Sequence, residues 1–269
     1  MDSDRLPPAD TVTPAAAPAT LQALQAELAD CQQQLAQLQA AHEGFLRAVS
    51  HDLRAPLRHL TSFAPLLRES VDTLAEATPG EAADEAQEFL GTMEQSARKM
   101  GRMLDALMQL SRAVRQPLDV QAVDVRGVLQ SCAARAQPAL DAVAWGLPAQ
   151  PVLLQADSAA LHAVLGELLG NAAKFSAGQA QPQVQVTLTM PSPGLWQLSI
   201  CDNGVGFASE RMAPTWPPFQ RMHRESDFDG VGCGLALSHA LAQRMGATLQ
   251  LQSQPGAGCT VVLAWPAAE

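Results

Sequence analysis

The chain has 269 residues, of which 47% are hydrophobic, and a formal net charge of −10 at pH 7. This length and apolar content suffice for one full hydrophobic core and a second, smaller unit. The negative charge repels phosphate backbones and anionic headgroups, so we expect no nucleic-acid or membrane-surface binding. The sequence has no apolar run of about 18 residues, no apolar signal segment and no C-x-x-C pair among its five cysteines. These features predict no membrane insertion and a cytoplasmic location.

Three segments of different composition precede the second half of the chain. Residues 1–20 are rich in Ala, Pro and Thr, which predicts a disordered tail. Leucines recur at heptad spacing through residues 21–42, which predicts a short parallel coiled coil. Residues 43–116 carry two helical apolar stripes separated by a break at 78–80, as in an antiparallel hairpin. A hairpin cannot cover both stripes by itself, so we expect a homodimeric four-helix bundle.

Residues 117–269 change to a mixture of helix and strand patterns. A polar pair, Asp157 and Ser158, is expected to cap a helix that runs to about Phe175. Alternating apolar residues predict strands, and 3.6-residue periodicity predicts helices. The predicted strands are 120–123, 184–188, 196–200, 248–252 and 260–264, and the other predicted helices are 125–137 and 235–245. This order predicts an α/β sandwich with helices on one face of a sheet, so the fold class is α + α/β.

The first chemical motif is the string SHDLRAPL, residues 50–57. His51 faces outward in both heptad registers that its neighbours allow, and exposure is what a reactive histidine needs. Neutral imidazole, with an ordinary pKa of about 6.5, is a nucleophile at pH 7. Asp52 can accept a hydrogen bond from one ring nitrogen and leave the other lone pair free to attack phosphorus. Taken alone, an exposed histidine is most often a solvated surface residue.

The second motif lies on the helix that Asp157 and Ser158 cap. Glu167, Asn171 and Lys174 follow one another at spacings that place them on one face. An amide oxygen such as that of Asn171 can bind Mg²⁺, a lysine can meet phosphate, and Phe175 at the helix end can stack on a base. Taken alone, such a helix is ordinary.

Two glycine-rich strings follow, DNGVGF at 202–207 and GVGCGL at 230–235. A carboxylate at a strand end, such as Asp202, can accept a hydrogen bond from the amino group of adenine. Glycines permit positive φ and close approach of the backbone, and the helix that opens near Leu235 favours phosphate at its N-terminus. The glycines in question are Gly204, Gly206, Gly230, Gly232 and Gly234.

In this order the motifs resemble the H, N, G1 and G2 boxes of bacterial sensor histidine kinases, and residues 218–223 stand where the F box belongs. The resemblance spans residues 43–266, and residues 219–237 are especially similar to kinases attached to phytochrome and PAS sensors. It implies an ATP-binding domain of the GHKL type at 117–269, which follows a dimerisation and phosphotransfer domain at 43–116. It also implies autophosphorylation of His51 from ATP and Mg²⁺, transfer to an aspartate of a response regulator, and an upstream sensor protein.

The resemblance assigns roles to individual residues. It implies that Asn171 coordinates Mg²⁺, that Asp202 recognises adenine and that Arg221 approaches the γ-phosphate. The glycines of the two strings shape the ATP lid and its hinges.

Two departures from the family pattern leave alternatives open. Glu167 stands where similar kinases often have Asn, whereas ATPases of the wider superfamily use a Glu there to activate water. One alternative is therefore an ATPase switch that uses Glu167. A separate alternative is a degenerate kinase that holds nucleotide and acts as a dimeric scaffold. Many kinases of the family carry Thr or Asn four residues after the histidine to orient water, and Ala55 at that position predicts weak phosphatase activity towards the regulator.

Overall fold

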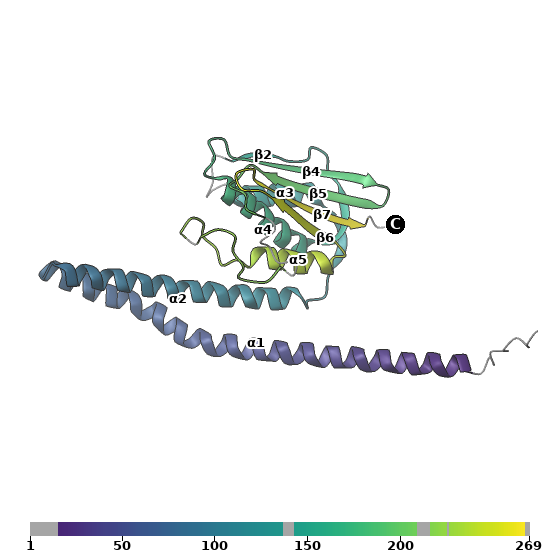
Figure 1. Ribbon diagram of the computed structural model, residues 1–269, viewed down its shortest axis with the longest axis horizontal. Helices are drawn as coiled ribbons and strands as arrows, with labels where there is room; N and C mark the ends of the chain where they lie inside the picture. Colours follow the sequence, from purple (N-terminus) through teal and green to yellow (C-terminus); the bar gives the residue numbers. More distant parts are fainter. Residues whose placement is uncertain (1–15, 137–142, 209–215, 225, 267–269) are drawn as a thin grey trace, which may run out of the picture. The chain divides into compact units, whose positions relative to one another are not determined.

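The computed structural model describes residues 16–136, 143–208, 216–224 and 226–266, and divides into compact units at residues 1–49 and 50–269. Figure 1 shows its helices and strands. Among the described residues, no helix is both long enough and apolar enough to cross a membrane.

Two long helices form the first half of the chain. Helix α1 spans Ala16–Ala77, continues through Pro56 and Pro65, and is separated by a short turn from α2, Glu81–Ala113. The turn falls where the sequence predicts the break. Helix α1 already includes residues 16–20, which the sequence assigns to a disordered tail, because a run rich in alanine has high helix propensity. The rest of that tail, residues 1–15, lies outside the described residues.

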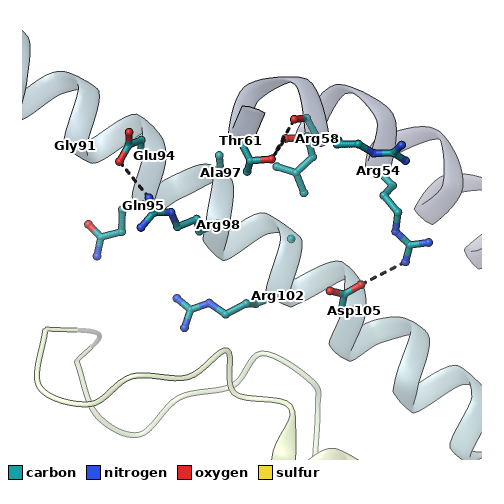
Figure 2. A pocket seen from close by; sticks show the side chains of 12 residues that line it. Arg54, Arg58, Thr61, Gly91, Glu94, Gln95, Ala97, Arg98, Arg102 and Asp105 are labelled. Carbon is teal, nitrogen blue, oxygen red and sulfur yellow. Dashed lines mark hydrogen bonds and ion pairs between the residues drawn. The ribbon is translucent and has the colours of Figure 1, made fainter. Parts of the chain in front are cut away.

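The hairpin made by the second part of α1 and by α2 has two different faces. Inside one chain, Leu90 and Ala97 of α2 are buried, and Glu94 is buried beside them. Glu94 accepts hydrogen bonds from Arg68 of α1 and Arg98 of α2. Figure 2 shows the contact with Arg98 and the separate Arg54–Asp105 ion pair. The predicted apolar stripe lies elsewhere and is largely exposed in a single chain. Its exposed members are Leu53, Leu60, Phe63, Leu67, Leu74, Phe89, Met93 and Met100.

The second half of the chain is a two-layer α/β domain, as the sequence predicts. A five-stranded sheet has the order β2-β4-β5-β7-β6, in which β2 and β4 are parallel and the other pairs are antiparallel. The strands are β2 Ala144–Gly146, β4 Gln183–Ser192, β5 Leu195–Asp202, β6 Thr248–Ser253 and β7 Cys259–Pro266. A separate antiparallel pair joins β1, Val120–Asp124, to β3, Leu153–Asp157. The sequence does not predict β2 or β3.

Three helices cover one face of the sheet: α3, Val125–Ala136, α4, Ser158–Ser176, and α5, Gly234–Arg244. Helix α4 is central, because it packs on β4 and β5 and against both other helices (Figure 1). Its buried leucines meet strand residues such as Val186 and Ile200 in one hydrophobic core. The side chain of Asp157 caps α4 by accepting a hydrogen bond from the N–H of Ala160 at 2.8 Å. The polar face of α4 is thereby held at the carboxyl end of β5.

Candidate nucleotide-binding site

A cavity of about 450 Å³ lies between α4 and the segment that precedes α5. This volume is within the range of small-molecule sites. The cavity collects most of the residues predicted to bind nucleotide, which come from sequence positions more than sixty residues apart. They are Glu167, Asn171, Lys174, Phe175, Arg221, Gly230, Gly232, Gly234 and Leu235. We call this the outer cavity.

A smaller inner cavity of about 40 Å³ adjoins the outer one, and Asn171, Phe175 and Leu235 line both. Asp202, the last residue of β5, is 6% exposed and lines the inner cavity. Its Oδ1 accepts hydrogen bonds from the N–H groups of Gly204, at 2.9 Å, and Cys259, at 3.2 Å. Both donors bind Oδ1, so they fix the carboxylate at the strand end while Oδ2 takes part in neither bond. Apart from Asn171 and His223, the remaining side chains of the lining are apolar, which suits the faces of a planar base.

Burial has opposite effects on the pKa values of the acids and the base at this site. It raises the pKa of Asp202, although the two backbone donors oppose the shift. It also raises the pKa of Glu167, which nearby Lys174 opposes. Burial lowers the pKa of Lys174, and the charge of Arg221 lowers it further. A cluster that holds two cations in a partly buried cavity is suited to a ligand with several negative charges.

Both cations of this cluster donate hydrogen bonds to backbone oxygens of the chain. The ammonium of Lys174 donates to the carbonyl oxygen of Asp229 at 3.2 Å. The guanidinium of Arg221 donates to the carbonyl oxygens of Phe228 and Gly230. The carboxylate of Asp229 pairs with Arg102 of α2 at 2.6 Å, and this contact is the main cause that lowers the pKa of Asp229.

An aromatic cluster that the sequence reasoning missed lies at the junction of the two cavities. The ring of His223 lies 5.1 Å from Phe175, 5.1 Å from Phe228 and 6.1 Å from Phe207, measured between centroids. Desolvation lowers the pKa of His223, which favours the neutral ring. His223 belongs to residues 218–223, the segment that stands where the F box belongs. Only the fold shows that its ring packs on aromatic rings of two other segments.

The backbone geometry of the site requires glycine at position 206, and Gly234 leaves room for the carboxylate of Glu167. Gly206 has φ of 56°, and a Cβ there would collide with the carbonyl oxygen of Gln254. At Gly234 a Cβ would collide with the carboxylate of Glu167. A side chain at either position would therefore displace the backbone or the acid that borders the cavity.

The structure does not bring His51 and Asp52 to either cavity among the residues that it describes. Both side chains are on α1 and more than 80% exposed, and Nδ1 of His51 lies 3.2 Å from Oδ1 of Asp52. The acid therefore contacts the ring nitrogen nearest the backbone and leaves Nε2 directed away from that contact. This is the arrangement that the sequence predicts for a nucleophilic ring.

The hairpin has a larger cavity, about 760 Å³, lined by Arg54, Arg58, Arg98 and Arg102 among others (Figure 2). Its arginines are mostly paired with Glu94, Asp105 and Asp229. None of the predicted nucleotide-binding residues lines this cavity. The hairpin cavity is larger, but the predicted nucleotide-binding residues line the inner and outer cavities. We therefore assign the nucleotide to those two cavities.

Two family models match the chain. Residues 41–116 match the His Kinase A (phospho-acceptor) domain, and residues 156–269 match the histidine kinase-, DNA gyrase B-, and HSP90-like ATPase domain. Together these matches cover well over half of the chain. The chain belongs to the sensor histidine kinase family.

Curated members of this family from several bacteria are similar to the chain. Sensor protein KdpD from Rathayibacter rathayi is 30% identical over 236 residues, which cover 87% of this chain and 26% of that protein. Phytochrome-like protein Cph1 from Synechocystis is 25% identical over 89% of this chain and 31% of that protein. The chain thus spans between a quarter and a third of the length of these two relatives.

Solved histidine kinase structures share the fold. ShkA, determined full-length in complex with AMPPNP, superposes with a TM-score of 0.57 and 24% identity, covering 83% of this chain and 46% of ShkA. The histidine kinase AdeS of Acinetobacter baumannii superposes with a TM-score of 0.52 and 21% identity, covering 81% of this chain and 98% of AdeS. The expected helical hairpin followed by a GHKL-type α/β domain is confirmed.

Proposed function

We propose that the chain is an ATP-dependent protein-histidine kinase that phosphorylates His51 and then transfers the phosphoryl group to an aspartate of a response regulator. The observation that carries this proposal is the separation of two environments. An exposed histidine with an acid on its ring stands on the hairpin, while a cation-bearing cavity with a buried carboxylate lies in the α/β domain. The family model matched by residues 156–269 supports ATP as the nucleotide.

Within the proposed site, Asp202 accepts a hydrogen bond from the adenine amino group in the inner cavity. Asn171 supplies an amide oxygen to Mg²⁺ in the outer cavity, where the described part of the chain holds no cluster of three acid, histidine or cysteine side chains that could bind a metal by itself. A metal held by one amide oxygen and by phosphate oxygens fits the coordination preference of Mg²⁺, which usually keeps several water ligands. Lys174 and Arg221 neutralise phosphate oxygens.

The chemical step needs little covalent help beyond the nucleophile. Nε2 of His51 attacks the γ-phosphorus, the bond to the β–γ bridging oxygen breaks, and ADP leaves with that electron pair. Asp52 holds the ring by its Nδ1 atom, as the 3.2 Å contact allows, and stabilises the positive ring that forms. In the transfer to the regulator, a carboxylate oxygen of the aspartate attacks the phosphorus, the bond from phosphorus to Nε2 breaks, and the imidazole of His51 leaves.

The exposed apolar stripe supports the proposal of a homodimer. Eight large hydrophobic side chains of the hairpin are between 46% and 65% exposed in one chain, an arrangement that a second copy would bury. The leucines of the preceding segment, such as Leu28 and Leu35, are also more than half exposed, as a coiled coil with a second chain requires. We retain the division at residues 20, 42 and 116 and the cytoplasmic location as parts of this proposal.

Labelling with γ-labelled ATP tests the proposed nucleophile. His51→Ala should abolish labelling and leave Mg-ATP binding intact, because the ring lines neither cavity. His59→Ala is the matched control, since His59 is another exposed histidine on α1, and it should be labelled normally. The label should be acid-labile and alkali-stable, as a phosphoramidate is. Undiminished labelling of His51→Ala would refute the assignment.

Glu167 favours a second candidate, an ATPase switch. Its carboxylate faces the outer cavity, and burial raises its pKa, which makes it a better proton acceptor than an exposed glutamate. The two candidates differ in where the phosphate goes. A kinase accumulates protein-bound phosphate that is lost in His51→Ala, whereas an ATPase releases free phosphate at a rate that His51→Ala does not alter and Glu167→Gln abolishes.

A further inference from the structure

The inner cavity is too small for the base that the proposed function places there. Its 40 Å³ holds about three water molecules, far less than a purine needs. Asp202 meets the polar requirement for adenine, but the inner cavity alone lacks the space for the base. A base that reaches Asp202 therefore has to extend into the outer cavity, past the residues that line both cavities.

The ring of His223 is one of the groups that line both cavities. It does not stand alone, because Phe228 packs on it at 5.1 Å and also on Phe175 at 4.9 Å. Phe175 is the residue whose ring is expected to stack on the base. Two rings of the segment before α5 thus cover the surface that adenine would use.

The same segment also engages the cations of the outer cavity. Lys174 binds the carbonyl oxygen of Asp229, and Arg221 binds the carbonyl oxygens on either side of it. Arg102 holds the Asp229 carboxylate from α2. The partners of Lys174 and Arg221 are carbonyl oxygens, which are hydrogen-bond acceptors as phosphate oxygens are.

We propose that His223 and the segment Phe228–Gly230 form an internal plug that occupies the nucleotide site in place of ATP. The rings of His223 and Phe228 take the position of the base, while the backbone oxygens of the segment take the position of phosphate oxygens. Mg-ATP binds only after the plug is displaced, so the plug sets the apparent affinity. This inference rests on the proposed nucleotide site.

A plug and a simple structural contact predict opposite effects of mutation. If these side chains only support the lid, or contact the bound nucleotide, their removal weakens Mg-ATP binding. If they compete with the nucleotide, their removal strengthens it. When the plugged state holds about nine-tenths of the population, its loss tightens the apparent Kd roughly tenfold.

Calorimetric titration with Mg-ATP distinguishes these cases in the full chain. Phe228→Ala removes one ring of the plug, and Asp229→Asn removes the charge that binds Arg102 but keeps the side-chain oxygen that accepts from the N–H of Gly230. The matched control is Asp227→Asn, because Asp227 is an exposed acid of the same segment that bonds the hydroxyl of Ser226. We expect tighter binding in Phe228→Ala, a smaller gain in Asp229→Asn and wild-type affinity in the control. Unchanged or weaker binding in Phe228→Ala would overturn the plug.

Hydrogen exchange without nucleotide supplies a readout that does not depend on the proposed function. The N–H of Phe219 donates to the carbonyl oxygen of Gly232 at 2.9 Å, a bond across the base of the segment. Its exchange should accelerate in Phe228→Ala and stay at the wild-type rate in Asp227→Asn. If no variant binds Mg-ATP, the proposed nucleotide site fails, and exchange alone then decides on the plug. Equal exchange rates in wild type and Phe228→Ala would reject it.

Discussion

Asp202 binds two backbone N–H groups and is proposed to bind adenine. Replacing it by Asn should keep the first interaction and remove the second. Oδ1 accepts from the N–H groups of Gly204 and Cys259, and a side-chain amide oxygen can do the same. The second oxygen becomes an NH₂ group, which cannot accept from the adenine amino group. Alanine would be a poorer probe, because each buried N–H left unpaired costs about 1–3 kcal/mol of stability.

The expected loss of nucleotide affinity follows from the bond that disappears. A hydrogen bond to a charged group contributes about 1.5–3 kcal/mol. At 1.4 kcal/mol for each tenfold change, the Kd of Mg-ATP should rise roughly 10- to 150-fold. The preference for ATP over GTP should shrink as well, because the new NH₂ group can donate to the 6-oxo group of guanine.

Folding should be unaffected or slightly favoured by this substitution. Burial raises the pKa of Asp202, so the ionised carboxylate opposes folding at pH values above its folded-state pKa. That penalty disappears as the pH falls and the group takes up its proton, and Asn removes it at every pH. At pH 7 the variant should therefore unfold at a temperature no lower than wild type.

Calorimetry with Mg-ATP and Mg-GTP, together with thermal unfolding, measures both interactions. Asp124→Asn is a suitable control, because Asp124 is exposed at the end of β1 and bonds only the backbone N–H of Arg126 among the contacts described. A folded Asp202→Asn protein with wild-type affinity and wild-type preference for ATP would refute the assignment of the base.

Three further outcomes are expected. Asn171→Ala should weaken Mg-ATP binding but leave metal-free ATP binding nearly unchanged, and equal losses with and without Mg²⁺ would contradict a metal ligand. Leu60→Asp should dissociate or unfold the dimer, because it places an unpaired charge in the bundle, and light scattering that shows a folded wild-type monomer would contradict the dimer. Ala55→Thr should speed loss of label from the phospho-regulator in the presence of ADP, because a hydroxyl can orient water, whereas rapid loss with the unmodified protein would show that Ala55 is no limitation.

Local signals accounted for much of the fold. The sequence predicts the turn after Ala77, the cap at Asp157 and the four long strands, because each depends on neighbouring residues. It does not predict β2, which has three residues and no alternating pattern. Nor does it predict β3, which runs directly into the cap of α4 at Asp157 and pairs with the distant strand β1. Partners distant in sequence determine both strands.

In the candidate site, too, local motifs predict part of the arrangement and contacts between distant segments determine the rest. The motifs indicate which residues line the cavities, since Glu167, Asn171 and Lys174 share a face of α4. They do not indicate that Arg221 and Lys174 bind backbone oxygens of the chain. A phosphate oxygen and a carbonyl oxygen are both acceptors, so the residue type alone cannot distinguish them. Only the arrangement of the segment before α5 decides which acceptor is present.

His51 and Asp202 need opposite environments, which explains why the chain carries them on separate elements. In the proposed mechanism, His51 must be exposed so that both the γ-phosphate and the aspartate of a regulator can reach Nε2, and its side chain is 86% exposed. Asp202 must be buried, because a carboxylate surrounded by water would distinguish adenine weakly. No single pocket can satisfy both requirements. Nucleotide binding and phosphoryl transfer are therefore separable by mutation, and the transfer step requires that the outer cavity and the exposed face of α1 meet.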